Sequence, residues 1–282
     1  METITVIRDN RENKIIPATR NTIRYVPLLL DKKPTAGKNI IIKPQITGKK
    51  ITGCIVSRMT ITTAPILLLL VTGEIEIEGH RPQTRGIYYH ELITLDTSLY
   101  YFGIETKTET HIQEYLDLNV MSFELRGERG SAVYMKINVR GRTETISENI
   151  EVLEELKSER YFFLYGNEIS LNGEVIEDTA GFILEGKLLH ETVKTHTFRI
   201  RRKETDNSDF SFMREEISAE LTFTNPEEYE AGYKASFSIS LERLIYEGEE
   251  SYPDASGVWG RNFRYRVYGK LKVRVYTNTE EL

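Results

Sequence analysis

The stretch FRYRVYGKLKVRV, residues 263–275, decides the fold class of this chain. Its odd positions are apolar except for Gly269, and its even positions are mainly arginine and lysine. Successive side chains of a β-strand point to opposite faces, so a strand separates these two sets of residues. Gly269 lies in the middle of the alternation and predicts a bulge or bend there. The stretch therefore predicts one strand with a buried face and a charged face.

Shorter stretches with the same alternation recur along the chain. They are residues 75–77, 133–139, 198–200 and 237–241. Short alternating stretches separated by turn residues are typical of β-sandwich and jelly-roll proteins. We therefore predict an all-β fold, built as two β-sandwich or jelly-roll-like halves that are joined by a short helix.

One segment near the middle of the chain has helical periodicity instead. Ser147 can cap a helix, and Ile150, Leu153 and Leu156 form an apolar stripe on an otherwise acidic segment. This pattern predicts a helix over residues 147–158. The predicted domains are an N-terminal β domain at residues 1–144, a linker helix at 145–159 and a C-terminal β domain at 160–282.

Two weaker helical turns are predicted at corresponding places in the two halves. Residues 110–118 place three apolar residues on one side of a helix, and Asn225 can cap a turn that continues through Pro226 and two glutamates. Each turn precedes an alternating stretch, a variable loop and a stretch with one basic face. This shared order suggests an internal duplication. The alternative is that two unrelated β domains share these features.

The longest apolar run of the chain has no polar position. It consists of Ile66, Leu67, Leu68, Leu69, Leu70 and Val71. A run of six residues has the length of a strand, and a strand without a polar face cannot face water. We predict either a core strand that is covered on both faces or an assembly interface that buries its second face on another subunit.

Basic residues gather on the predicted strand faces. They are Arg199, Arg201, Arg202 and Lys203 in one cluster, and Arg264, Arg266, Lys270, Lys272 and Arg274 in the other. Clustered cations can contact phosphates, but the net charge of −6 is unlike that of a general nucleic-acid binder. The favoured interpretation is a ladder of ion pairs on the solvent side, with the acidic stretch at residues 74–78 as the partner strand. A contact with nucleic acid is the weaker alternative.

The chain carries no recognisable catalytic motif. It has no G-x-S-x-G elbow, no G-x-G-x-x-G sequence and no Walker loop. None of the five histidines has the spacing of a metal-binding pair, and the single cysteine, Cys54, is predicted to be a buried residue within a strand at residues 51–59. We predict a protein that is not an enzyme and has no metal or cofactor. An enzyme whose residues meet only in the folded chain is the alternative.

The acidic stretch at residues 246–262 is predicted to be an exposed loop. It carries Tyr252, Asp254 and Trp259, which suit a contact with a carbohydrate or a protein. Its acidic residues do not have the spacing of an EF-hand, so a solvated loop is favoured over a calcium site.

The composition indicates a thermophilic source. Glutamine occurs only three times, whereas glutamate, lysine, arginine, isoleucine and tyrosine are abundant. This bias is typical of hyperthermophiles, because desolvating ions costs less at high temperature. The N-terminus has no signal-peptide pattern, and no apolar run is long enough for a membrane span. We expect the protein in a virion or in the host cytoplasm.

The predicted layout, two β domains with a short helix between them, resembles the double jelly roll of icosahedral virus capsid proteins. This resemblance implies a structural protein that assembles into a virion, as a capsid, vertex or tail protein of a virus with a thermophilic archaeal host. Its partners would be copies of itself and other structural proteins. A single jelly roll with a β appendage and a tail-tube protein fit the chain length nearly as well. The alternative function is a β-sandwich binding module that recognises carbohydrate or protein through residues 246–262.

Overall fold

The computed structural model describes residues 4–8, 13–16, 18–30, 45–80, 88–94, 101–107, 112–147, 160–166, 168–177, 179–189, 193–203, 216–230, 233–253 and 259–277. These residues form one helix, α1 (Thr63–Thr72), and eighteen strands. The strands before residue 148 are β1 (Ile4–Arg8), β2 (Asn13–Ile16), β3 (Ala18–Asn21), β4 (Arg24–Leu30), β5 (Gln45–Arg58), β6 (Gly73–His80), β7 (Tyr88–Thr94), β8 (Phe102–Lys107), β9 (Ile112–Glu128), β10 (Tyr134–Gly141) and β11 (Thr143–Ser147). The later strands are β12 (Ile169–Leu171), β13 (Glu174–Val175), β14 (Thr179–Leu189), β15 (Val193–Lys203), β16 (Ile217–Glu230), β17 (Tyr233–Pro253) and β18 (Trp259–Thr277).

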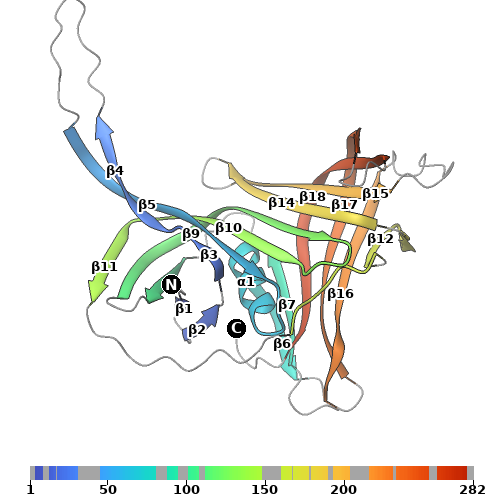
Figure 1. Ribbon diagram of the computed structural model, residues 1–282, viewed down its shortest axis with the longest axis horizontal. Helices are drawn as coiled ribbons and strands as arrows, with labels where there is room; N and C mark the ends of the chain where they lie inside the picture. The colour runs from blue at the N-terminus through green and yellow to red at the C-terminus, as the bar shows by residue number, and fades with distance from the viewer. Residues whose placement is uncertain are drawn as a thin grey trace, which may run out of the picture.

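The strands belong to one large antiparallel sheet that is not closed (Figure 1). One continuous path through it runs β4–β5–β10–β9–β14–β15–β18–β17–β16–β12–β13. The long strands β9 and β18 connect its parts. β9 pairs with β10 and β11 on one edge and with β8 and β14 on the other, and β18 pairs with β17 on one edge and with β15 and β7 on the other. The prediction of a mostly β fold is confirmed. Strands from both sides of the predicted domain boundary are hydrogen-bonded to each other, at β9–β14 and β7–β18.

Strand β18 confirms the interpretation of the stretch that decides the fold class. The apolar side chains at its odd positions are at most 6% exposed, and the arginines at its even positions are exposed. Gly269 has a φ angle of 89°. It lies where β18 has one residue more than β17 between two paired positions, so the predicted bulge is present. The alternating residues of β10, β15 and β17 are buried in the same way.

The prediction of a strand at residues 66–71 is wrong, because this run lies in helix α1. Thr60 and Thr63 stabilise the start of the helix. The backbone N–H of each residue donates to the hydroxyl oxygen of the other, and both donor–acceptor distances are 3.0 Å. Gly73 ends it with a φ of 92°, and its N–H bonds to the carbonyl oxygen of Leu69. Four leucines favour a helix. A helix that is apolar on every side lacks the periodicity that would distinguish it from a buried strand.

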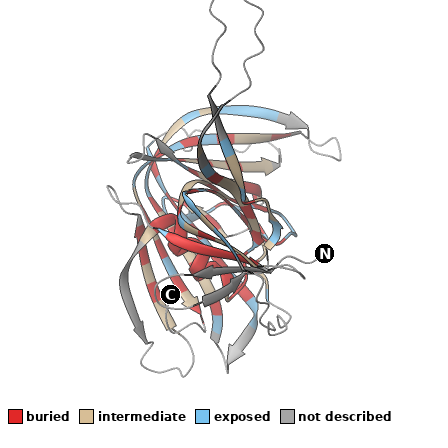
Figure 2. Cartoon of the chain, turned by 90° about the vertical axis from the view of Figure 1, so that its left-hand side faces the viewer, coloured by how far each residue is buried: buried red, intermediate tan, exposed pale blue. Residues whose placement is uncertain are grey.

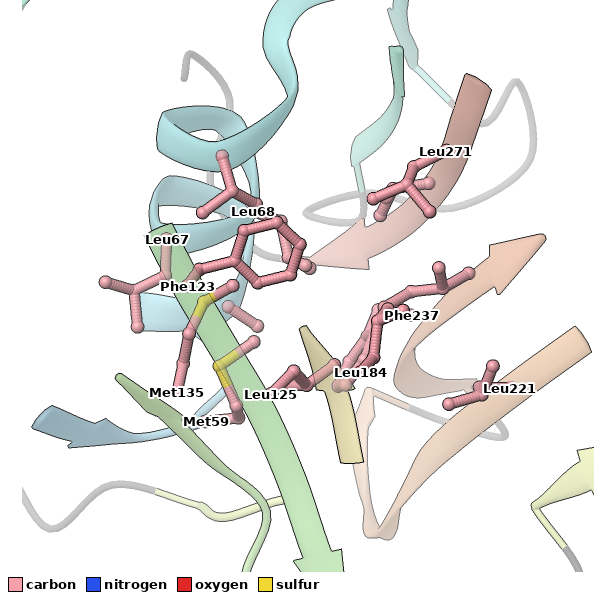
Figure 3. Packing of buried hydrophobic residues seen from close by; sticks show 14 of the residues in the cluster. Met59, Leu67, Leu68, Phe123, Leu125, Met135, Leu184, Leu221, Phe237 and Leu271 are labelled. Carbon is pink, nitrogen blue, oxygen red and sulfur yellow. The ribbon is translucent and has the colours of Figure 1, made fainter. Parts of the chain in front are cut away.

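Helix α1 lies inside the fold, where it packs against β6, β7, β9 and β18. All ten of its residues are buried, as the red helix in Figure 2 shows. Leu67, Leu68, Phe123 and Met135 belong to one buried hydrophobic cluster, which Figure 3 shows from close by. Burial by the chain itself favours the core alternative for this run over the assembly interface.

The predicted linker helix can be compared with the structure only at its start. Residues 145–147 belong to β11, and residues 148–159 lie outside the described residues. The two weaker helical turns are wrong, because residues 112–118 lie in β9 and residues 225–228 lie in β16. Asn225 does cap a local turn: its Oδ1 accepts from the N–H of Glu227 at 3.0 Å, within a register shift of the β16–β17 pair. Strand pairing therefore overrides the local helical preference. The suggested internal duplication is no longer supported by these two turns.

Four phenylalanines form the centre of the second part of the core. The Phe237 ring lies edge-on to the Phe162 ring at 4.9 Å and stacks on the Phe223 ring at 4.8 Å. The Phe182 ring lies 5.4 Å from that of Phe223. Each of these side chains is at most 1% exposed. They come from β14, β16, β17 and the segment at residues 160–164, so the cluster holds these elements together.

No helix in the described residues is long and apolar enough to span a lipid bilayer.

Candidate functional site

A pocket of about 660 Å³ lies across four neighbouring strands, β14, β15, β18 and β17. It is lined by Phe182, Ile183, Arg199, Arg201, Glu247, Gly248, Glu249, Glu250, Asn262 and Arg264. Two groups of residues that the sequence singled out meet here. One is the pair of basic clusters, and the other is the stretch at residues 246–262.

Pairing of β15 with β18 brings the two basic clusters together. Arg199 lies directly opposite Arg264, and Arg201 lies opposite Asn262. The sequence predicts both basic faces but not that they are adjacent. Like charges that face each other across two strands repel, so this arrangement needs carboxylates close by.

Glu185 and Glu247 supply these carboxylates. Arg199 donates to Glu185 at 2.6 Å, and Glu247 accepts from Arg264 at 3.0 Å and from Arg266 at 2.6 Å. The Glu247 side chain is 21% exposed, against 55% and 57% for its two arginine partners. Exposed pairs of this kind stabilise a fold by up to about 1 kcal/mol each. Their main effect is to hold the guanidinium groups at set positions on the pocket wall.

A bulge in β17 places Glu247 between its two partners. Tyr246 pairs with Tyr265, and Gly248 pairs with Arg264, so Glu247 is the extra residue of the strand. Gly248 has a φ of 154°, which favours glycine.

The ladder of ion pairs is present farther along β18, but its partners differ from the predicted ones. Lys272 lies 2.9 Å from Glu242 of β17, and Arg274 lies 3.9 Å from Glu91 of β7. The predicted acidic partner strand is β6, which pairs with β7 and not with β18. The period of two places charges on a face, but it does not say which strands are neighbours.

Two tyrosines, Tyr246 of β17 and Tyr265 of β18, pack against each other beside the pocket strands. The rings of Tyr246 and Tyr265 are 5.8 Å apart, and Tyr265 is fully buried. Burial raises the pKa of the Tyr265 phenol, and nearby Tyr246 and Glu249 raise this pKa further. Its hydroxyl has no hydrogen-bond partner within the described part of the chain. The phenol therefore stays neutral at physiological pH.

The prediction of a loop at residues 246–262 is wrong for most of its length. Strand β17 continues to Pro253, which pairs with Trp259 at the start of β18. Tyr252 pairs with Gly260, and Asp254 lies outside the described residues. The pairing of β17 with β18 continues through these polar residues because main-chain hydrogen bonds tolerate solvated side chains. No local pattern in the sequence indicates the pocket wall, because the wall depends on which strands are neighbours.

Other candidates from the sequence occupy structural positions. Cys54 lies in β5 as predicted, is half-buried, and has its Sγ 3.3 Å from the Thr22 hydroxyl oxygen. Among the described residues no three His, Cys, Asp or Glu side chains lie close enough together to hold a metal ion.

No protein-family model matches the chain, and no curated protein sequence matches it.

Proposed function

We propose that this protein is a structural protein that assembles with copies of itself, as a component of a virus particle from a thermophilic archaeal host. The observation that carries the proposal is a β-hairpin, formed by β4 and the first six residues of β5. This hairpin projects beyond the other described strands (Figure 1). Below, these residues, 24–30 and 45–50, are called the arm.

The arm leaves the body from a well-anchored base. The N–H of Thr22 donates to the carbonyl oxygen of Cys54 at 2.9 Å, and the N–H of Cys54 donates to the Thr22 hydroxyl at 3.0 Å. A Cβ atom on Gly53 would lie 2.4 Å from the Ile23 backbone, so only glycine permits this close approach. Beyond this base β4 and β5 pair only with each other among the described strands.

An isolated two-stranded ribbon is marginally stable in water, and its outer edges are templates for further strand pairing. The arm sequence includes Leu28, Leu29, Leu30 and Ile46, which is more apolar than a solvated ribbon needs. Docking on a neighbouring copy would satisfy both the backbone edges and the apolar residues. The virus-particle setting is supported by the thermophile-type composition and the β-rich chain. We also propose that the two halves of the chain are sandwich-like, as in jelly-roll capsid proteins.

The test is removal of the arm. In the variant, residues 28–48 are replaced by Asn-Gly, a two-residue turn that closes the Pro27–Lys49 pair. We expect the wild-type protein to form large symmetric particles or tubes in light scattering and negative-stain microscopy. The variant should remain a folded monomer, with an unfolding free energy within about 1 kcal/mol of wild type. A wild-type monomer at high concentration across salt and pH, or a variant that assembles normally, contradicts the proposal.

A second candidate is recognition of a neutral saccharide, and the make-up of the pocket favours it. Three arginines and three glutamates line the pocket, so their charges cancel, and Asn262 adds an amide. Planar groups of these types bind pairs of hydroxyls, while Phe182 and Ile183 offer an apolar wall. A charged ligand would be repelled by the three pocket side chains of its own sign, whereas a neutral polyhydroxylated ligand can form hydrogen bonds with side chains of both signs.

The saccharide candidate is tested by calorimetry and thermal shift with a panel of neutral mono- and oligosaccharides. A ligand at about 10 mM should raise the melting temperature of the wild-type protein. Asn262→Ala and Glu250→Ala should each weaken binding about tenfold or more, because each leaves ligand hydroxyls unpaired. The control is Glu220→Gln, an exposed glutamate of β16 outside the pocket. Absence of any shift across the panel rejects this candidate.

A further inference from the structure

We propose that the arm of one copy pairs with strand β6 of a second copy, and that charge complementarity selects this contact. The inference rests on the proposed self-assembly and names the surface that receives the arm. It is carried by two open strand edges of opposite charge.

Strand β6 is the acidic side of the contact. Its sequence, GEIEIEGH, holds three glutamates and neither lysine nor arginine. It pairs with β7 along one edge, and no described strand pairs with its other edge. An open edge of this kind accepts an added strand through main-chain hydrogen bonds.

The arm is the basic side of the contact. Its described residues include Arg24, Lys49 and Lys50, and no acidic residue. The described residues of the arm therefore have a net charge of +3. The whole chain has a net charge of −6, so the arm is a basic segment on an otherwise acidic protein.

Three other open edges, those of β2, β11 and β13, suit the arm less well. Strand β2 has the sequence NKII, with a lysine and no acidic residue, and β11 has the sequence TETIS, with a single glutamate. Strand β13 is two residues long, whereas β6 has eight residues and β4 has seven. Of these four edges, β6 therefore combines a matching length with the highest acidic charge.

The positions of the two elements make the contact intermolecular. In Figure 1 the arm projects at the top of the view and β6 lies near the bottom, at the other end of the molecule. The arm of one chain therefore meets the β6 strand of another chain. A contact between two different surfaces repeats from copy to copy and produces a ring or a filament.

The experiment is a charge exchange in the full-length protein. Variant A carries Lys49→Glu and Lys50→Glu in the arm, and variant B carries Glu74→Lys and Glu78→Lys in β6. Each variant alone faces like charges across the contact, so its assembly concentration should rise about tenfold or more. In an equimolar mixture the acidic arm of A meets the basic β6 of B, and the basic arm of B meets the acidic β6 of A. The mixture should therefore assemble near the wild-type concentration.

The control makes the same charge change elsewhere. Lys136→Glu with Lys187→Glu reverses two exposed lysines of β10 and β14, and this variant should assemble like wild type. Melting temperatures check the fold of every variant. If variant B melts early, Glu74→Gln with Glu78→Gln replaces it. This neutral variant should assemble more weakly than wild type, with a smaller dependence on salt.

The outcomes separate the two proposals. Loss of assembly in A and B with recovery in the mixture supports the arm–β6 contact. If the wild type assembles but A and B assemble equally well, or if the mixture of folded variants does not recover, this contact is overturned while self-assembly stands. The same holds if the neutral variant assembles like wild type. A wild-type protein that stays monomeric overturns both proposals.

Discussion

Leu68→Asp should abolish folding of this protein. Leu68 is 1% exposed and lies in α1, which is enclosed by β6, β7, β9 and β18. An unpaired carboxylate at this depth costs several kcal/mol after relaxation, and the lost leucine packing adds about 3 kcal/mol. The sum is comparable to the whole stability of an ordinary domain, about 5–15 kcal/mol. We expect insoluble protein, or soluble protein without a cooperative unfolding transition by circular dichroism.

Two further variants give this prediction its controls. Leu68→Met keeps the volume and should cost less than about 1.5 kcal/mol in urea denaturation. Ile146→Asp places the same charge on a side chain that is 61% exposed, and it should change stability by about 0.5 kcal/mol or less. A folded, soluble Leu68→Asp monomer would place this apolar run on the outside of the fold and restore the assembly-interface alternative.

Phe237→Ala should lower the free energy of unfolding by about 4 kcal/mol. The Phe237 side chain is fully buried and contacts two other aromatic rings, at 4.9 and 4.8 Å. Alanine removes both ring contacts and leaves a cavity that rigid strands on every side cannot close. Urea denaturation measures the loss, and β-sheet content by circular dichroism in water should stay unchanged if the remaining stability suffices.

The matched control for Phe237→Ala is Tyr101→Ala, which truncates an aromatic residue that is 55% exposed. It should cost less than about 1 kcal/mol. Equal losses for the two variants would contradict the assignment of Phe237 to the centre of the core.

Local patterns predicted the strands where one face is buried and the other is solvated. Strand β18 is the clearest case, because its apolar residues from Phe263 to Val275 stand at odd positions and its basic residues there stand at even positions, with Tyr268 as the exception. The local pattern predicted the wrong element at α1, where every side chain is buried and no periodicity remains to separate a helix from a strand. The local pattern is also wrong at Asn225, where a capping side chain and Pro226 indicate the start of a helix. These residues lie in strand β16, and Asn225 caps only a local turn within it.

The candidate site was only half predictable. The basic residues and the acidic stretch at 246–262 were identified from the sequence, but their meeting in one pocket was not. Arg199 and Arg264 become neighbours because β15 pairs with β18, and Glu247 reaches Arg264 because β17 pairs with β18. The arm was missed as well, because projection from a body has no signature in residue types.

The sequence by itself determined that this chain is mostly β and which side chains of β10, β15, β17 and β18 face the core. These are local properties, since the direction of a side chain follows from its position along one strand. Only the tertiary structure decided which strands are neighbours, that the apolar run is a helix within the core, and which strand edges remain open. Strands pair through backbone N–H and C=O groups that are the same for nearly every residue, so the choice of partner depends on the whole fold.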